Sequence, residues 1–364
     1  MKGEAAISET AQRPPDTGER SVSLTQRSDV LTRLRRLGSH LVQQRETTVF
    51  VVVVLLVLYF RFFSAASSSY FSGLSISTLT QYAAPIIIIA CGEVLLLICG
   101  EIDLSPGFVY TFAPFLMHYL IDFYRVPVIP AILISLLMGL AVGWVNGFLT
   151  VTLGLPSFIS TLGTGFVLYG LTNTTSHATA ANIPTSAAGI GKWIGGTSYQ
   201  SGYSYAQIVW AVVLVAIFHV VLTRTRWGLH TIAVGGNQLG AAEAGINVGR
   251  IKYGNFMLTG VLGAFVGLQV AFFTQTIDPT AGGYQPMFYS VAAAVLGGTA
   301  MLGGSGTIIG AFLGSVMLAV LNEGFTAAGI SANPIFIIFG GAIIVAMVAN
   351  IQLARLREVG RIRR

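Results

Sequence analysis

The sequence contains a succession of long apolar runs that hold almost no Lys, Arg, Asp or Glu. A run of about 20 apolar residues is long enough to cross the hydrocarbon core of a bilayer as a helix. The runs are continuously apolar and do not alternate with a period of two, which disfavours a transmembrane barrel. Only 9% of the residues are charged, whereas about 25% are charged in an ordinary soluble domain. The sequence therefore predicts an all-α, polytopic helical membrane protein.

The apolar runs predict about ten transmembrane helices, several of them interrupted by Gly or Pro. The Ser-Ala-Ala-Ser sequence at 64–67 resembles a signal-peptide cleavage region, but the polar tail before the first run is too long for such a signal. We therefore expect an uncleaved first span. The predicted spans are 47–63, 81–99, 107–121, 127–151, 157–172, 207–222, 255–274, 288–302, 306–323 and 333–350.

The positions of Lys and Arg predict how these spans are oriented. With ten spans and a cytoplasmic N-terminus, 17 of the 20 Lys and Arg residues lie on the cytoplasmic side. The chain then divides into a disordered basic tail over 1–46, a transmembrane domain over 47–351 and a basic tail over 352–364. We expect both tails to be cytoplasmic and to contact the anionic lipid surface of the bilayer rather than nucleic acid.

One unit of the sequence occurs twice, five predicted spans apart. The first copy has Asn-Gly-Phe at 146–148 and Pro-Ser-Phe-Ile at 156–159, and the second has Asn-Glu-Gly-Phe at 322–325 and Pro-Ile-Phe-Ile at 334–337. Each copy follows a helix with glycines four residues apart. Because five is odd, the two copies cross the bilayer in opposite directions. Such an inverted internal repeat is typical of transport proteins, and the alternative is a coincidence between two glycine-rich stretches.

Three carboxylates, Glu93, Glu101 and Asp103, lie within eleven residues of an otherwise apolar region. A charged side chain at the bilayer centre costs about 2.5–3.5 kcal/mol, so these residues do not serve stability. Glycines and a proline over 100–107 predict a broken helix, which is tolerated only where it lines a cavity or is buried in protein. Ser105 is the expected N-cap of the next helix. We interpret the stretch as the lining of a functional cavity, the alternative being a solvated loop.

The segment 237–245 predicts a short helix between two groups of basic residues. Asn237 is a suitable N-cap and Gly245 a suitable C-terminal stop for a helix over 238–244. A helix of this length is not stable alone in water. We therefore expect it to dock on a surface, the alternative being a loop packed on its own domain.

No catalytic, metal or cofactor site is visible in the sequence. The two cysteines form no CxxC motif, and the five histidines form no HxxxH pair. The glycine-rich stretch at 303–306 lacks the Lys-Ser/Thr of a phosphate loop. We therefore expect a protein that is not an enzyme and that holds no cofactor or metal. Energy for active transport would come from another protein or from an ion gradient.

Several short motifs follow one another between about residues 77 and 350. They are Gly-Glu-Ile-Asp-Leu-Ser-Pro-Gly at 100–107, Leu-Pro-Ser-Phe-Ile-Ser-Thr-Leu-Gly at 155–163, Gly-Asn at 236–237 before Ala-Gly-Ile at 244–246, and Leu-Gly-Gly at 296–298 before Gly-Gly-Ser-Gly at 303–306. In this order they resemble the permease subunits of bacterial ribose-type ABC importers, which carry monosaccharides. Glu101 and Pro106 depart from the commoner Gly and Val of that family, which leaves the sugar open.

The resemblance implies a ten-helix permease subunit in the bacterial inner membrane. It implies three partners: a second permease copy, as a homodimer or a related heterodimer, an ATPase subunit with nucleotide-binding domains, and a periplasmic substrate-binding protein. The segment 237–245 resembles the coupling helix of the family, which docks on the ATPase. The residues expected in this contact are Asn237, Gly240, Ala241, Ala242, Glu243 and Gly245.

A pathway for a sugar must offer hydrogen bonds to hydroxyl groups without holding the sugar tightly. The residues expected to line it are Glu93, Glu101, Asp103, Ser105, Asn146, Phe158 and Asn322. Two other interpretations stay open. The same machinery transports nucleosides or branched-chain amino acids in related permeases. In an ion-coupled secondary transporter, the three carboxylates Glu93, Glu101 and Asp103 would instead bind protons or sodium ions.

Overall fold

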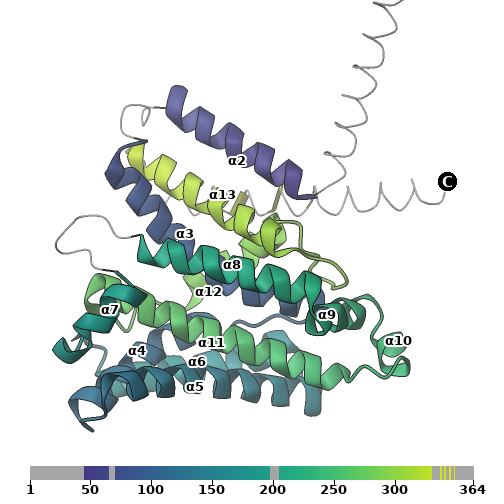
Figure 1. Cartoon of the computed structure of the whole chain (residues 1–364), viewed down its shortest axis with the longest axis horizontal. Helices are drawn as coiled ribbons and strands as arrows, with labels where there is room; N and C mark the ends of the chain where they lie inside the picture. Colours follow the sequence, from purple (N-terminus) through teal and green to yellow (C-terminus); the bar gives the residue numbers. More distant parts are fainter. Residues whose placement is uncertain are drawn as a thin grey trace, which may run out of the picture.

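The computed structural model describes residues 45–64, 70–196 and 205–329, together with six single positions between 337 and 348. The described chain is a helical bundle (Figure 1) with one two-stranded ribbon. The long helices are α2 (Arg45–Phe62), α3 (Gly73–Ile98), α4 (Pro106–Asp122), α5 (Val128–Gly147), α6 (Ser157–Ser176), α8 (Ala206–Arg224), α11 (Val248–Thr274), α12 (Tyr284–Leu296) and α13 (Ile308–Ala327). The short helices are α7 (Ala188–Ile194), α9 (Arg226–Gly236) and α10 (Gln238–Glu243). A π-helical turn (Phe148–Thr152) extends α5, and a 3₁₀ turn (Thr185–Ala187) precedes α7.

Each of the first nine predicted spans corresponds to one of the long helices. Five stretches are long and apolar enough to cross a membrane by length and composition: α3, α5 with its π-helical turn, α8, α11 and α13. The polytopic helical class is therefore confirmed. The tenth predicted span, residues 1–44 and the tail over 352–364 lie outside the described residues, apart from the six single positions in the tenth span.

The predicted range 288–302 is wrong at both ends, because α12 begins at Tyr284 and ends at Leu296. Gly297 caps the helix, and Gly298 has a φ of +91°, which a helix does not accommodate. With 13 residues, α12 is about 20 Å long, shorter than a hydrocarbon core of about 30 Å. α4, with 17 residues, is about 25 Å long. Each of these two short helices follows a non-helical segment.

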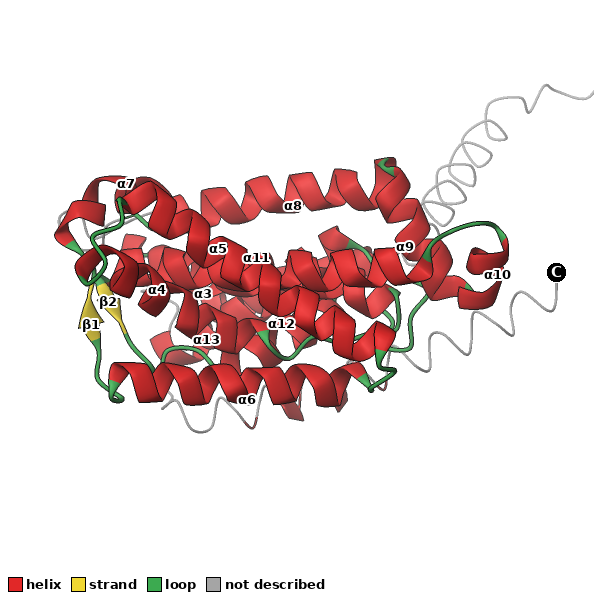
Figure 2. Ribbon diagram, turned by 90° about the horizontal axis from the view of Figure 1, so that it is seen from below, coloured by secondary structure: helices red, strands yellow, loops and turns green. Residues whose placement is uncertain are grey.

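α3 lies at the centre of the bundle, and 83% of the residues in its most apolar 18-residue stretch are buried. It packs against α8, α11, α12 and α13, while α2 packs on the outer side of α13 (Figure 1). α5 and α6 lie on the opposite side, with α4 and α5 packed on α11. The ribbon formed by β1 (Ala181–Asn182) and β2 (Thr276–Ile277) lies at one end of the bundle and α10 at the other (Figure 2).

The packing repeats between two units, α3–α4–α5 and α11–α12–α13. The long helix of each unit packs on the two following helices of the other: α3 on α12 and α13, and α11 on α4 and α5. α3 and α11 run in opposite directions, since Glu101, just after α3, forms an ion pair with Lys252 near the start of α11. The units are therefore inverted relative to each other, as the repeat in the sequence predicts.

Glycines allow close backbone contacts within both units. A Cβ atom on Gly143 of α5 would collide with the carbonyl oxygen of Phe256 on α11. A Cβ atom on Gly314 of α13 would collide with the carbonyl oxygen of Ala293 on α12. Small residues in these positions let helix backbones approach inside a membrane, where no hydrophobic effect drives helices together.

Candidate functional site

The chain between α3 and α4 is not helical, and Asp103, Leu104 and Ser105 within it are buried in the bundle. We call residues 99–105 the first broken segment. It begins where Gly100 takes a φ of +76°. Side chains of α6 satisfy its backbone: Ser157 Oγ accepts from Ile102 N at 3.2 Å, and Thr161 Oγ1 accepts from Leu104 N at 3.0 Å. Irregular backbone is stable at membrane depth only when protein groups satisfy it in this way.

Four predicted pathway residues, Glu93, Asp103, Ser105 and Asn146, come together around this segment, and we call them the buried polar cluster. Each is at most 1% exposed. Asp103 Oδ1 accepts from Ser105 N at 2.8 Å and from Asn146 Nδ2 at 3.3 Å. Glu93 Oε2 accepts from Asp103 N at 3.5 Å. The structure thus brings together residues from α3, the first broken segment and α5.

Two carboxylate oxygens of the buried polar cluster, Glu93 Oε1 and Asp103 Oδ2, have no hydrogen-bond partner within the described parts of the chain. Buried polar groups are normally hydrogen-bonded, because leaving them unpaired costs free energy. These two oxygens therefore remain available as hydrogen-bond acceptors, and a role for them in a pathway stays a prediction.

Ser105 occupies the N-cap position of α4, but its side chain makes no capping hydrogen bond. Its hydroxyl accepts from Asn146 Nδ2 at 2.8 Å instead. The predicted N-cap position is therefore confirmed, while the Ser105 hydroxyl takes part in the buried polar cluster instead of a capping hydrogen bond. Pro106, at the first helical position, has no N–H that needs a cap.

The other three predicted pathway residues lie elsewhere. Glu101 pairs with Lys252, with 2.6 Å between Oε1 and Nζ. Phe158 is 51% exposed on α6. Asn322 lies half-buried on α13, and the residue after it, Glu323, is the buried one. Ser75 Oγ donates to Glu323 Oε1 at 2.5 Å. A role for Glu101, Phe158 and Asn322 in a pathway stays a prediction.

A second broken segment, residues 275–283, joins α11 to α12 and was not recognised in the sequence. Asp278 Oδ1 accepts from Thr280 N at 2.8 Å, the same turn that Asp103 makes with Ser105. Both turns belong to the pattern Asp-x-Ser/Thr-x-Gly, at 103–107 and at 278–282. This repeated pattern is the feature of the sequence from which the second broken segment could have been predicted.

The two broken segments start from opposite ends of the bundle. The first begins at the α10 end, and the second follows α11 at the other end, where β2 lies (Figure 2). The second segment ends against the first turn of α4, where Gly283 N donates to the carbonyl oxygen of Gly107 at 2.7 Å. A Cβ atom on Gly107 would collide with Gly283, so glycine is required where the second broken segment contacts α4. The starts of α4 and α12 therefore face each other inside the bundle.

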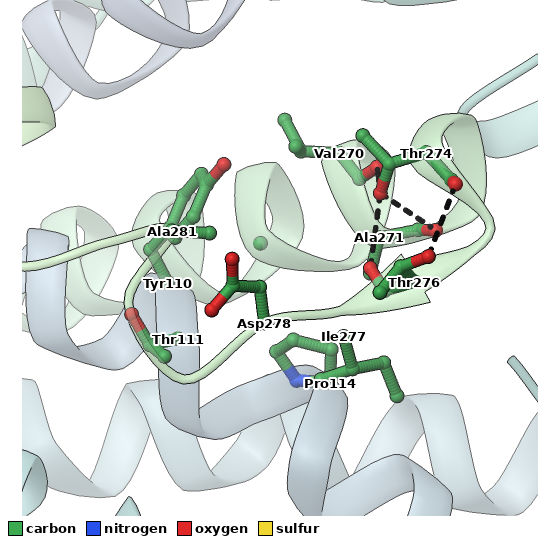
Figure 3. A pocket seen from close by; sticks show the side chains of 11 residues that line it. Tyr110, Thr111, Pro114, Val270, Ala271, Thr274, Thr276, Ile277, Asp278 and Ala281 are labelled. Carbon is green, nitrogen blue, oxygen red and sulfur yellow. Dashed lines mark hydrogen bonds between the residues drawn. The ribbon is translucent and has the colours of Figure 1, made fainter. Parts of the chain in front are cut away.

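A cavity of about 180 Å³ lies beside the second broken segment (Figure 3). It is lined by α4, α11 and residues between 276 and 281. Its walls are mainly apolar, and its polar side chains are Tyr110, Thr111, Thr274, Thr276 and Asp278.

α10 extends from the end of the bundle (Figures 1 and 2). Asn237 caps it, accepting from Gly240 N at 2.9 Å, and Gly245 has a φ of +81°. The predicted helix over 238–244 is present, although it ends one residue earlier, at Glu243. Of the predicted docking residues, Ala241 is buried and packs with Cys99, while Asn237, Ala242, Glu243 and Gly245 are exposed and Gly240 is half-buried. Leu239, which was not singled out, is 78% exposed.

Within the residues that the structure places, no group of three or more His, Cys, Asp or Glu side chains could hold a metal ion. The buried polar cluster instead offers hydrogen-bond acceptors and amide and hydroxyl donors. Such a set suits a neutral polar solute with several hydroxyl groups.

Comparison with known proteins decides the family. Residues 75–348 match the family model described as "Branched-chain amino acid transport system / permease component". The chain belongs to this permease family. Members of the family are transport subunits rather than enzymes. Family membership and the long apolar helices together make the permease a multi-pass membrane protein.

Relatives of the permease carry names of sugar importers. The xylose/arabinose import permease protein XylH of Sulfolobus acidocaldarius is 36% identical over 79% of this chain and 81% of the relative. The ribose import permease protein RbsC of Escherichia coli is 28% identical over 78% of this chain and 88% of the relative. The fructose import permease protein FrcC of Rhizobium meliloti is 28% identical over 76% and 78%. No solved structure matches the permease.

Proposed function

We propose that the permease is the membrane subunit of an ATP-driven importer that carries a monosaccharide or a related polyol across the bacterial inner membrane. The observation that supports this proposal is the buried polar cluster, whose carboxylate, hydroxyl and amide groups suit the hydroxyl groups of a sugar. The names of the relatives support a sugar as cargo.

In this proposal the α10 end of the bundle is cytoplasmic and the end with β1 and β2 is periplasmic. The distribution of Lys and Arg supports the orientation, since Arg224, Arg226, Arg250 and Lys252 all flank the α9–α10 region. The sugar arrives from a periplasmic binding protein and passes along the second broken segment toward the first. A second permease copy, identical or related, completes the membrane part.

α10 docks on the separate ATPase subunit, which hydrolyses the ATP. Support comes from its position at the tip of the bundle and from the exposed side chain of Leu239. A six-residue helix gains little stability from its own hydrogen bonds, and a groove in a partner would both order it and cover its apolar residue.

The test is uptake by proteoliposomes that contain the permease with the ATPase and binding protein of the same importer. Each experiment offers one radiolabelled solute: D-xylose, L-arabinose, D-ribose, D-fructose or L-leucine. ATP is supplied either on the side of the membrane where the ATPase subunit lies or on the opposite side. We expect ATP-dependent accumulation of at least one sugar and none of leucine.

Each other outcome points to a specific alternative. Accumulation of leucine alone would favour the branched-chain amino acids named in the family description. Accumulation that needs an ion gradient but not ATP would favour a secondary transporter with Glu93 and Asp103 as ion sites.

A further inference from the structure

Lys252 connects α10 to the first broken segment. It lies near the start of α11, and its Nζ is 2.6 Å from Glu101 Oε1 and 3.3 Å from Gln238 Oε1. Gln238 is the first residue of α10. The Lys252 and Glu101 side chains are only 10% and 14% exposed. One ammonium group therefore bridges the proposed docking helix and the segment that carries Asp103.

The backbone around this bridge is closely packed. The carbonyl oxygen of Ile98, at the end of α3, accepts from Gly304 N at 2.9 Å. A Cβ atom on Gly235, at the end of α9, would collide with the same oxygen. Asn255 Nδ2 on α11 lies 3.3 Å from the carbonyl oxygen of Leu95 on α3 and 3.4 Å from Thr231 Oγ1 on α9. A displacement of α9 and α10 is therefore transferred to the end of α3.

From Glu101 the path to the buried polar cluster is short. Asp103 is two residues further along the chain, and it hydrogen-bonds Ser105 and Asn146. Only Ile102 separates Glu101 from Asp103, and its N–H is held by Ser157 Oγ of α6. A shift of Lys252 thus reaches the cluster through a continuous set of contacts.

We propose that the Lys252–Glu101 ion pair is the link that couples movement of α10 to the buried polar cluster, so that ATP hydrolysis in the partner opens the pathway. The inference rests on the proposed docking of α10. Lys252 and Glu101 are positioning residues in this scheme: they contact neither ATP nor the cluster, and act through the first broken segment.

The ion pair has a competing, purely structural explanation. Removing one member of a poorly exposed pair leaves an uncompensated charge, which destabilises a fold. A structural role lowers the amount of folded complex and therefore lowers ATP hydrolysis and sugar uptake together. A coupling role lowers the number of sugar molecules transported per ATP hydrolysed. The ratio of the two rates separates the explanations.

The experiment uses the complete importer in proteoliposomes, with D-xylose as the probe, or whichever of the tested sugars the unaltered importer accumulates best. The variants are Lys252→Met, Glu101→Gln and the exchanged pair Glu101→Lys with Lys252→Glu. Arg250→Gln is the matched control, because Arg250 is an exposed cation two residues from Lys252 on the same helix. Co-purification of the ATPase with each variant is measured first.

We expect Lys252→Met and Glu101→Gln to retain the ATPase and to lower sugar transported per ATP at least fivefold. The exchanged pair should recover at least half of the ratio, and Arg250→Gln should leave it unchanged. An unaltered ratio in both single variants, with the ATPase still bound, would overturn the coupling role while leaving the proposed function intact. An equal fall of both rates at constant ratio would also overturn it. Loss of uptake in the unaltered importer would instead count against the proposed function.

Discussion

Asn146 connects the parts of the buried polar cluster, because its side-chain amide both donates and accepts hydrogen bonds. Its Nδ2 donates to Ser105 Oγ at 2.8 Å and to Asp103 Oδ1 at 3.3 Å, while its Oδ1 accepts from Thr164 Oγ1 at 2.6 Å. Carboxylate, hydroxyl and amide groups on three elements are thereby connected in one network. Hydrogen bonds in such a buried network are stronger than in water, while Asp103 Oδ2 has no partner among the described residues.

Replacing Asn146 with Ala should lower the free energy of unfolding by about 1–3 kcal/mol, because Ser105 and Thr164 lose a buried partner. The measurement is equilibrium unfolding in mixed detergent micelles. Asn173→Ala is the control, since Asn173 Nδ2 only donates to the carbonyl oxygen of Tyr169 in the same helix, and a change within about 0.5 kcal/mol is expected there. Equal losses in the two variants would show that the network contributes nothing special to stability.

At the scale of elements, apolar runs located the helices well, because hydrophobic length is the dominant constraint in a bilayer. The predicted helix ends were less accurate where the apolar sequence continues beyond the end of the helix. Residues 297–302 carry no charge, yet Gly298 and, just beyond them, Gly303 have φ of +91° and +92°, and the helix has already ended at Leu296.

The candidate site was predicted only in part for a related reason. Glu93, Asp103 and Ser105 are near one another in sequence, and their grouping was foreseen. The pairing of Glu101 with Lys252 joins residues 151 positions apart and depends on how α3 packs against α11. Asp278 is a single carboxylate in its region, and its relation to Asp103 becomes visible only once the two broken segments are compared.

α10 provides a prediction at the same scale. Leu239→Glu, which replaces the exposed apolar side chain of α10 by a charge, should reduce co-purification of the ATPase at least tenfold and leave membrane insertion unchanged. Trp193→Glu is the control, because Trp193 is 80% exposed and lies on α7 at the opposite end (Figure 1). Undiminished recovery of the ATPase with Leu239→Glu, and also with Gly240→Trp and Glu243→Arg, would exclude α10 as the docking element.

At the scale of the whole molecule, the two ends of the bundle differ in chemistry because of the elements outside the inverted units. One end has α9, α10 and a group of basic residues, and the other has α7 and the ribbon of β1 and β2. The broken segments enter from these opposite ends, and the second ends at Gly283, which contacts Gly107 at the start of α4.

The orientation can be measured with a reporter enzyme that is active only in the periplasm. A fusion within residues 188–194, on α7, should be active, whereas fusions at 233 and after 355 should be inactive, because basic residues are retained in the cytoplasm. The reverse pattern would place α10 outside the cell, where no ATPase could dock on it.

The central claim is that sugar passes the buried polar cluster where the two units meet. The most direct measurement is the initial rate of sugar uptake by the complete importer carrying Asp103→Asn, at equal amounts of assembled complex. Asn retains the oxygen that accepts from Ser105 N but removes the charge, so the turn is preserved. We predict at least a tenfold lower rate, with a similar fall for Glu93→Gln and no change for Asp122→Asn, a more exposed carboxylate on α4. Uptake at the unaltered rate in both Asp103→Asn and Glu93→Gln, and in the corresponding Ala variants, would contradict the account and place the pathway elsewhere.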